Sequence, residues 1–141
     1  MGRLLQRLSD ASRSGVYRAR RADGILETVQ GSQLKVVRIF LSGISEKQAL
    51  LEQIARTLEF PQWFGGNWDA LEDCLTDLSW LKAGGHVLIF EDTAQLPHDE
   101  RGVLADILAA AAAYWAERKR PFFAVFVGDA PELPDLYREK K

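Results

Sequence analysis

The sequence has little sulfur and no long apolar segment. One of its 141 residues is cysteine and one is methionine, which excludes a disulfide framework within the chain and a zinc site built on paired cysteines. No stretch approaches the roughly 20 consecutive apolar residues that cross a bilayer. Polar and charged residues interrupt the first ten positions, which therefore lack the apolar region of a secretory signal. We expect a cytoplasmic protein.

What the sequence does contain is an uneven distribution of charge. The formal net charge is −2, yet residues 61–117 carry ten acids and two bases, a formal charge of −8. The flanking segments are basic, with ten bases to six acids in residues 1–60 and six to four in residues 118–141. An acidic surface attracts basic partners and repels nucleic acid. The distribution favours a basic protein partner and argues against nucleic-acid binding.

Apolar patterning predicts three strands. Residues 34–43 are rich in branched apolar side chains, and residues 86–90 and 122–127 are nearly continuous apolar runs, as in strands covered on both faces. A long alanine-rich helix is expected between the last two strands. A strand–helix–strand connection of this length implies parallel pairing. The predicted fold class is α/β, a small three-stranded parallel sheet packed with helices.

Two further helices are expected between the first two strands. The first begins at Ser45, where Gln48 completes a capping-box pattern, and it ends before Pro61. The second follows Asn67, a good N-cap residue, and runs to about Leu81.

The predicted domain organisation has one folded unit with short flanks. Residues 34–130 form the α/β domain, and residues 131–141 form a C-terminal tail. Residues 1–33 form an N-terminal extension, in which Asp23-Gly24 predicts the turn of an accessory hairpin. Two interpretations stay open for the arginines of this extension, contact with RNA or phosphate and protection of a strand edge by charge, and the second is favoured. These residues are Arg18, Arg20 and Arg21.

The helix predicted after Asn67 has two different faces. At 3.6 residues per turn its apolar residues share one side; these are Leu71, Cys74, Leu75 and Leu78. Its carboxylates share the opposite side; these are Asp69, Glu72, Asp73 and Asp77. Like charges four residues apart destabilise a helix slightly, and the helix has no lysine to offset them. The acidic stripe alone supports a binding surface only weakly, since charged stripes are usually just solvated.

Aromatic residues strengthen the case for a binding surface. Four of them flank this helix in the sequence: Trp63, Phe64, Trp68 and Trp80. Trp68 is expected to pack in the core, whereas at least one of Trp63 and Phe64 is expected to be exposed. Gly65 and Gly66 can take the positive φ that turns the chain into the helix. Aromatic side chains beside carboxylates are typical interface anchors.

This stretch resembles the barstar family, intracellular inhibitors of secreted bacterial ribonucleases such as barnase. The matching positions are a proline, two aromatics, a glycine and an asparagine, followed by the motifs DAL and DCL. They are Pro61, Trp63, Phe64, Gly65, Asn67, Asp69–Leu71 and Asp73–Leu75. The order of elements from Lys35 to about Gly128 also matches that of the family.

The resemblance implies inhibition by occlusion, in which the acidic helix and the preceding loop plug a basic active site that otherwise holds RNA phosphate. By position, Trp63 would be the aromatic contact, Asp69 and Asp73 would replace phosphates, and Gly65 and Asn67 would support the loop. The whole predicted partner-binding set is Trp63, Phe64, Gly65, Asn67, Asp69, Glu72, Asp73 and Asp77. The expected partner is a small basic ribonuclease bound one to one by a monomer, without a cofactor, membrane or nucleic acid.

The same residues are compatible in composition with other functions. Cys74 beside Asp73, with His86 and His98, has the composition of a cysteine-based catalytic site, but a thiol on a buried stripe is inert. We therefore predict no enzyme and no catalytic residues. The outward carboxylates do not converge, so no metal site is predicted. One alternative stays open, an immunity module against another basic toxin, because the run Ala109–Ala113 stands where the best-known family member has acids, leaving Glu117 near the helix end.

Overall fold

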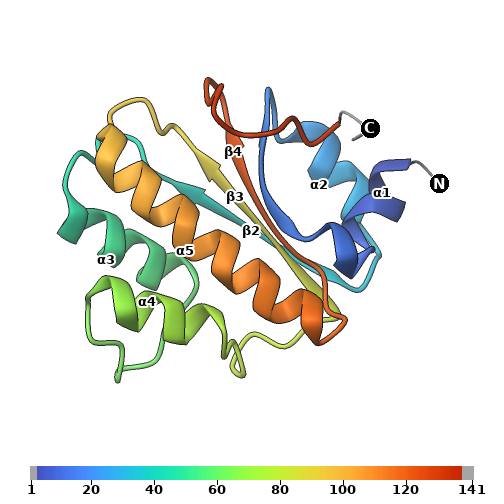
Figure 1. The fold of residues 1–141 in the computed structure, drawn as a ribbon, viewed down its shortest axis with the longest axis horizontal. Helices are drawn as coiled ribbons and strands as arrows, with labels where there is room; N and C mark the ends of the chain where they lie inside the picture. The colour runs from blue at the N-terminus through green and yellow to red at the C-terminus, as the bar shows by residue number, and fades with distance from the viewer. Residues whose placement is uncertain (1–2, 138–141) are drawn as a thin grey trace.

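A computed structural model describes residues 3–137 of the chain and contains one parallel β-sheet of four strands (Figure 1). The strands are β1 (Gly15–Ala19), β2 (Leu34–Phe40), β3 (Gly85–Glu91) and β4 (Phe122–Val127). Their order across the sheet is β1-β4-β3-β2, and every neighbouring pair is parallel. The two strands with continuous apolar sequences, β3 and β4, are therefore the central ones.

Helices cover both faces of the sheet (Figure 1). On one face lie α3 (Lys47–Thr57), α4 (Trp68–Leu75) and α5 (His98–Glu117). On the other lie α1 (Arg3–Leu8) and α2 (Asp23–Val29), and the short 3₁₀ helix η1 (Ala11–Arg13) lies beside α1 and α5. No helix within residues 3–137 is long and apolar enough to cross a membrane.

Each face of the sheet has its own apolar core. Leu88 and Phe90 of β3 point toward α3, α4 and α5, whereas Val87 and Ile89 of the same strand point toward α1 and α2. Because successive side chains of a strand alternate between faces, an unbroken apolar sequence is what two buried faces require. On the first face the rings of Phe90 and Phe126 stack with their centroids 4.9 Å apart.

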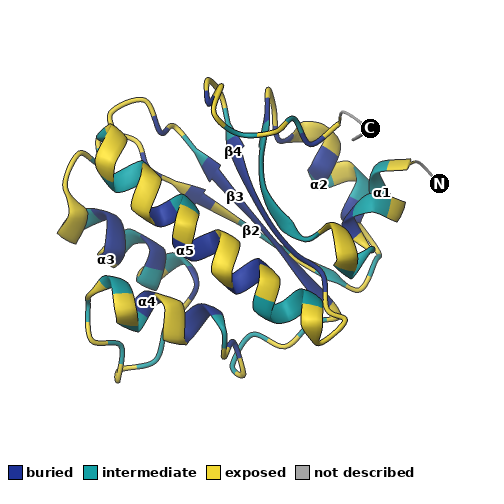
Figure 2. Cartoon of the chain, viewed as in Figure 1, coloured by how far each residue is buried: buried dark blue, intermediate teal, exposed yellow. Residues whose placement is uncertain are grey.

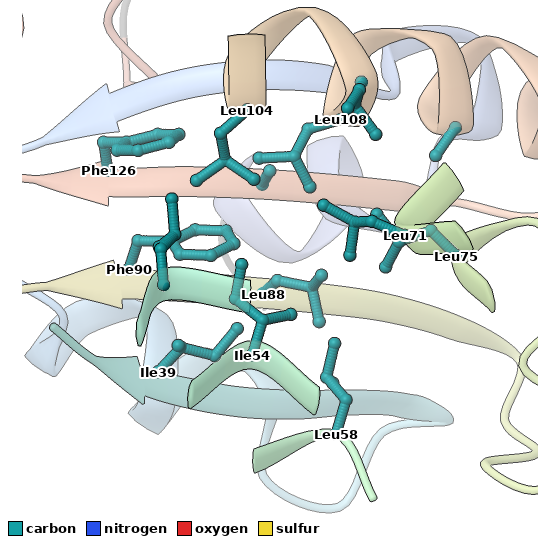
Figure 3. Close-up of a cluster of buried hydrophobic side chains, with 14 of the residues drawn as sticks. Ile39, Ile54, Leu58, Leu71, Leu75, Leu88, Phe90, Leu104, Leu108 and Phe126 are labelled. Carbon is teal, nitrogen blue, oxygen red and sulfur yellow. The ribbon is translucent and has the colours of Figure 1, made fainter. Parts of the chain in front are cut away.

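The helix α4 is attached to the sheet by its apolar stripe. Figure 3 shows Leu71 and Leu75 pointing from α4 into the cluster formed by strand residues such as Leu88 and by Leu108 of α5. Both leucines of α4 are almost completely buried. Fully burying a leucine side chain contributes about 1.5–3 kcal/mol relative to exposure. This packing fixes which side of α4 faces outward.

The prediction of a three-stranded sheet with an N-terminal hairpin is wrong. Residues 15–19 are extended, but they pair in parallel with β4, more than a hundred positions later in the chain. Asp23 and Gly24 begin helix α2, since Ile25 and Val29 lie one helical turn apart and both are buried. Burial against the sheet thus outweighs the turn preference of the Asp-Gly pair. Residues 1–2 of the predicted extension and 138–141 of the predicted tail lie outside the described residues.

Two helix boundaries also differ from the prediction. The N-cap of α3 is Glu46 rather than Ser45, and no side chain caps this helix. Gln48, predicted to close a capping box, instead donates from Nε2 to the carbonyl of Gly66 at 3.3 Å. Helix α4 ends at Leu75, because Leu78 adopts a φ of +51°, which a continuing right-handed helix does not allow. Leu78 is nevertheless buried with the rest of the predicted stripe.

Candidate functional site

The loop that precedes α4 turns at a single glycine. Gly66 has a φ of +75°, whereas Gly65 has no positive φ, so only the second of the two predicted glycines supplies the left-handed turn. The side chain of Asn67 then caps the helix by accepting the backbone N–H of Ala70 at 2.7 Å. The bond from Gln48 to the Gly66 carbonyl holds this turn against α3.

The aromatic residues of the loop divide into one exposed ring and several supporting rings. Trp63 is 58% exposed, the most exposed large apolar side chain in the described part of the chain. Its ring lies edge-on to Trp80 at a centroid distance of 6.2 Å. Phe64 is half-buried against the first core and lies edge-on to Phe60 at 5.0 Å. Trp68 is also half-buried against this core, in line with the expected packing role.

Two indole N–H groups hold the ends of the helices around this loop. Trp80 Nε1 donates to the carbonyl of Leu58 at the end of α3, at 3.0 Å. Trp115 Nε1 donates to the carbonyl of Leu75 at the end of α4, at 2.8 Å. The last carbonyls of a helix lack partners within the helix, so these bonds satisfy groups that would otherwise need water. No local sequence signal points to this role of Trp115, because its bonding partner lies 40 residues away along the chain.

The acidic stripe faces outward: three of its carboxylate residues lie in α4 and Asp77 lies just after the helix end. All four are exposed, while the apolar stripe on the other side is buried (Figure 2). The exposed residues are Asp69, Glu72, Asp73 and Asp77. Within residues 3–137 none of the four forms an ion pair with a basic side chain. The stripe thus adds negative charge to the surface without local compensation.

The thiol of Cys74 lies on the opposite side of the same helix. Burial, together with the charges of Asp77 and Asp73, raises the pKa of this thiol to about 11. At neutral pH it is therefore protonated and a poor nucleophile. His86 is also buried, and its Nε2 donates a hydrogen bond to the carbonyl of Leu81 at 2.7 Å.

The geometry does not bring the other candidate residues together into a chemical site. His86 is the second residue of β3 and the exposed His98 is the first of α5, at the opposite end of that helix from the strand start, so Cys74 and the two histidines lie on separate elements. Within the described residues no group of three His, Cys, Asp or Glu side chains is arranged to hold a metal ion.

Of the three N-terminal arginines, Arg18 contributes to the edge of the sheet. Arg18 lies in the edge strand β1, and its guanidinium donates to the carbonyl of Leu133 in the segment after β4. Its backbone N–H bonds to the carbonyl of Pro134 at 2.8 Å, so this segment covers the outer edge of β1. Arg20 and Arg21 are exposed.

Residues 34–127 match the model of one protein family, described as Barstar (barnase inhibitor). The chain belongs to the Barstar family. The match spans β2 through β4 and thus includes the aromatic loop, α4 and α5. No curated protein matched the chain significantly.

Membership of the Barstar family gives the exposed loop and α4 a functional context. The family description is that of a protein inhibitor, so a barnase-inhibitor-like role is the function class that the match supports. Residues 1–33 and 128–141 lie outside the match, although β1 completes the sheet and α2 covers one face of it.

Proposed function

We propose that this chain inhibits a basic ribonuclease by covering its active site with the Trp63 loop and the acidic face of α4. The observation that carries the proposal is the row of four exposed carboxylates with no basic partner in residues 3–137. A ribonuclease active site presents arginine and lysine side chains that bind RNA phosphates. Carboxylates accept charge-assisted hydrogen bonds from the same donors in a similar geometry.

The rigidity of α4 supports this role. The helix is capped by Asn67, anchored by two buried leucines and tied to α5 through Trp115. Its carboxylates therefore project from a fixed backbone before any partner arrives. Association costs less free energy when interface groups are already ordered. Asp69 and Asp73, one turn apart, are the pair that we expect to replace two phosphate positions.

The residues of the loop take different parts in the proposed interface. The exposed indole of Trp63 is the anchor that we expect to contact the partner, since aromatic rings at the centre of an interface contribute most to affinity. Phe64, Gly65 and Asn67 are proposed to position Trp63 and α4. This assignment follows from the half-buried ring of Phe64 and the capping bond of Asn67. Glu72 and Asp77 extend the negative surface on either side of Asp73.

The neighbouring face of α5 carries less charge than α4. Ala109, Ala110 and Ala113 are exposed in its middle, between the exposed acids Asp106 and Glu117. The proposed interface therefore depends mainly on α4 and its loop for electrostatic attraction. We expect fewer charge pairs with the partner than a surface with acids on both helices would make.

An inhibition assay tests the proposal. The chain is mixed with a panel of small basic microbial ribonucleases at low and moderate ionic strength, and RNA cleavage is measured. We expect inhibition of at least one enzyme, and this inhibition should weaken as salt screens the charges. Replacement Asp73→Asn should reduce affinity by about 3 kcal/mol, because it leaves a buried cation of the enzyme without its partner.

The matched control is Asp129→Asn, which removes an exposed carboxylate from the loop after β4. It should leave inhibition within a factor of about two, since substitutions of surface residues outside an interface have small effects. Equal losses for Asp73→Asn and Asp129→Asn would assign the effect to net charge and contradict a specific site. Absence of inhibition across the panel would contradict a ribonuclease target and direct the search to other basic toxins.

A further inference from the structure

A basic cleft lies at the opposite end of α5 from its N-terminus, where β3 and β4 begin. Its volume is about 750 Å³. Its walls come from the segment after α4, the start of β3 and the end of α5 with the residues that follow. Figure 1 shows these segments meeting at the C-terminal end of α5. The lining side chains that bear on its chemistry are Lys82, Arg118, Arg120, His86, Trp115 and Asp77. The cleft shares Asp77 with the edge of the proposed inhibitory surface, whose other residues do not line it.

The cleft carries an excess of positive charge. Three of its lining side chains are cations and one, Asp77, is a carboxylate. Lys35, the register partner of His86 on the neighbouring strand, adds a further cation near His86. Within residues 3–137 neither Lys82 nor Arg120 forms an ion pair, whereas Arg118 pairs with the exposed Glu117 at 3.8 Å. The cleft therefore keeps a net positive charge.

Helix dipoles account for only part of this cluster. The C-terminal end of a helix attracts cations, which explains a basic residue such as Arg118 directly after α5. The effect falls off within the last turn. Lys35 lies at the start of β2 and Lys82 lies well past the end of α4, so neither is placed by a helix terminus.

Several of the lining groups are held in place by bonds to backbone carbonyls. Arg120 donates from one guanidinium nitrogen to the carbonyl of Ala83 at 3.2 Å, and its remaining donors are left for another acceptor. The indole of Trp115 is fixed by its bond to Leu75, and Arg120 lies 5.9 Å from its ring centroid. The cleft thus combines an oriented aromatic ring with cations that still have donors available.

We propose that the basic cleft binds a phosphate-bearing small molecule of the nucleotide class. Its phosphate would accept hydrogen bonds from Lys82, Arg118 and Arg120, since arginine forks and lysine ammonium groups are the usual phosphate donors in proteins. Its base would lie against the half-buried ring of Trp115, because bases stack on aromatic side chains without needing a particular sequence. This site is separate from the Trp63 loop.

His86 provides a spectroscopic report on occupancy of the cleft. Burial, and then the charges of Arg120 and Lys35, lower the pKa of this imidazole, while its bond to Leu81 opposes them. An anion in the cleft would counter the two cations and raise that pKa. His98, exposed at the first residue of the 20-residue α5, lies about 30 Å away along the helix axis. It serves as an internal control for pH and ionic strength.

The experiment is an NMR titration of the two histidine rings with adenosine monophosphate, with adenosine and inorganic phosphate added separately. We expect the monophosphate to raise the pKa of His86 and leave the ring signals of His98 in place, and inorganic phosphate to act more weakly on His86 in the same direction. Adenosine alone should have little effect. An equal response to adenosine, or no response of His86 to the monophosphate, would overturn the proposal.

Charge-reversal variants complete the test. Lys82→Glu should weaken binding of the monophosphate at least about tenfold, because it replaces a phosphate donor with a like charge. Lys47→Glu makes the same change on an exposed residue of α3 that does not line the cleft, and it should leave binding unchanged. Both lysines are exposed, so neither variant removes packing from the core. If binding of the monophosphate weakened equally in the two variants, net charge alone would explain the effect, and the proposal would be overturned.

Discussion

Cys74 lies between two carboxylates of the proposed interface in the sequence, yet its side chain faces the core. Asp73 precedes it, and Asp77 follows one turn later on the exposed face. Burial is the largest cause of the raised pKa of the thiol, and the two negative charges act in the same direction. The pKa of the Cys74 thiol therefore depends both on the packing of α4 against the core and on the negative charges of its exposed face.

At the residue scale we predict that Cys74 resists thiol reagents in the folded protein. At pH 8 a disulfide reagent should react only as fast as the protein opens, because almost no thiolate forms well below a pKa of about 11. Adding denaturant should restore the rate of an ordinary cysteine. The reaction is followed by absorbance of the released thiolate, and rapid modification without denaturant would show that α4 faces the other way.

The same pKa shift has a consequence for stability. The folded-state pKa is raised above the unfolded value, so the neutral thiol stabilises the fold below the unfolded pKa. This contribution is lost as pH rises from about 9 toward about 11. The free energy of unfolding should fall across this window by on the order of 2 kcal/mol. Cys74→Ala, which has no titrating group at this position, should show a smaller decline over the same range.

At the element scale, α4 is too short to be stable alone. It has eight residues, and isolated helices shorter than about 12–15 residues are marginal in water. Its stability comes from the Asn67 cap, from the burial of its apolar stripe and from the indole of Trp115. The outward orientation of the carboxylates on α4 therefore depends on tertiary packing more than on helix propensity.

Removing the Asn67 cap should lower the stability of the fold and loosen the helix that carries the carboxylates. Asn67→Ala leaves the backbone N–H of Ala70 without its acceptor and should cost about 1 kcal/mol of unfolding free energy. Asn67→Asp keeps a side-chain acceptor and adds a charge that the helix N-terminus favours, so its stability should match or exceed that of the parent. Both values come from urea unfolding. Equal stability of Asn67→Ala and the parent would show that the cap contributes nothing.

The elements that could be predicted from sequence are those whose signal is local. The apolar runs of β3 and β4 and the two faces of α4 follow from residue type and spacing. For the loop, the sequence predicts only that at least one of Trp63 and Phe64 is exposed. The parallel pairing of β1 with β4 does not, because it joins positions more than a hundred residues apart. Helix α2 was missed since Asp23-Gly24 is a strong turn signal that only tertiary burial overrides. The anchoring bonds of Trp80 and Trp115 are likewise long-range.

At the scale of the whole molecule, the folded unit extends beyond both ends of residues 34–127, which match the Barstar family. The second apolar core includes residues outside the match, among them Leu8, Ile25 and Leu136, all almost completely buried. Together with α1 and α2 they cover the face of β3 and β4 opposite to α4. Arg7 also donates to the carbonyl of Leu136, which connects the N-terminal helix to the segment after β4. Residues 34–127 alone would leave this face uncovered.

We therefore predict that deleting residues 1–33 prevents stable folding even though the proposed interface is retained. The deletion removes β1, α1 and α2 and exposes strand side chains such as Val87 and Phe123, which are now fully buried. Strong binding of a hydrophobic dye and loss of a cooperative thermal transition are expected. A truncated chain as stable as the parent would place the domain boundary at residue 34.

A milder test of the same core is Ile25→Ala, which should lower the free energy of unfolding by about 2–5 kcal/mol. The control is Glu27→Ala, which changes an exposed residue of the same helix. Because Ile25 lies on the far side of the sheet from α4, the Ile25→Ala variant should still inhibit at temperatures where it is folded.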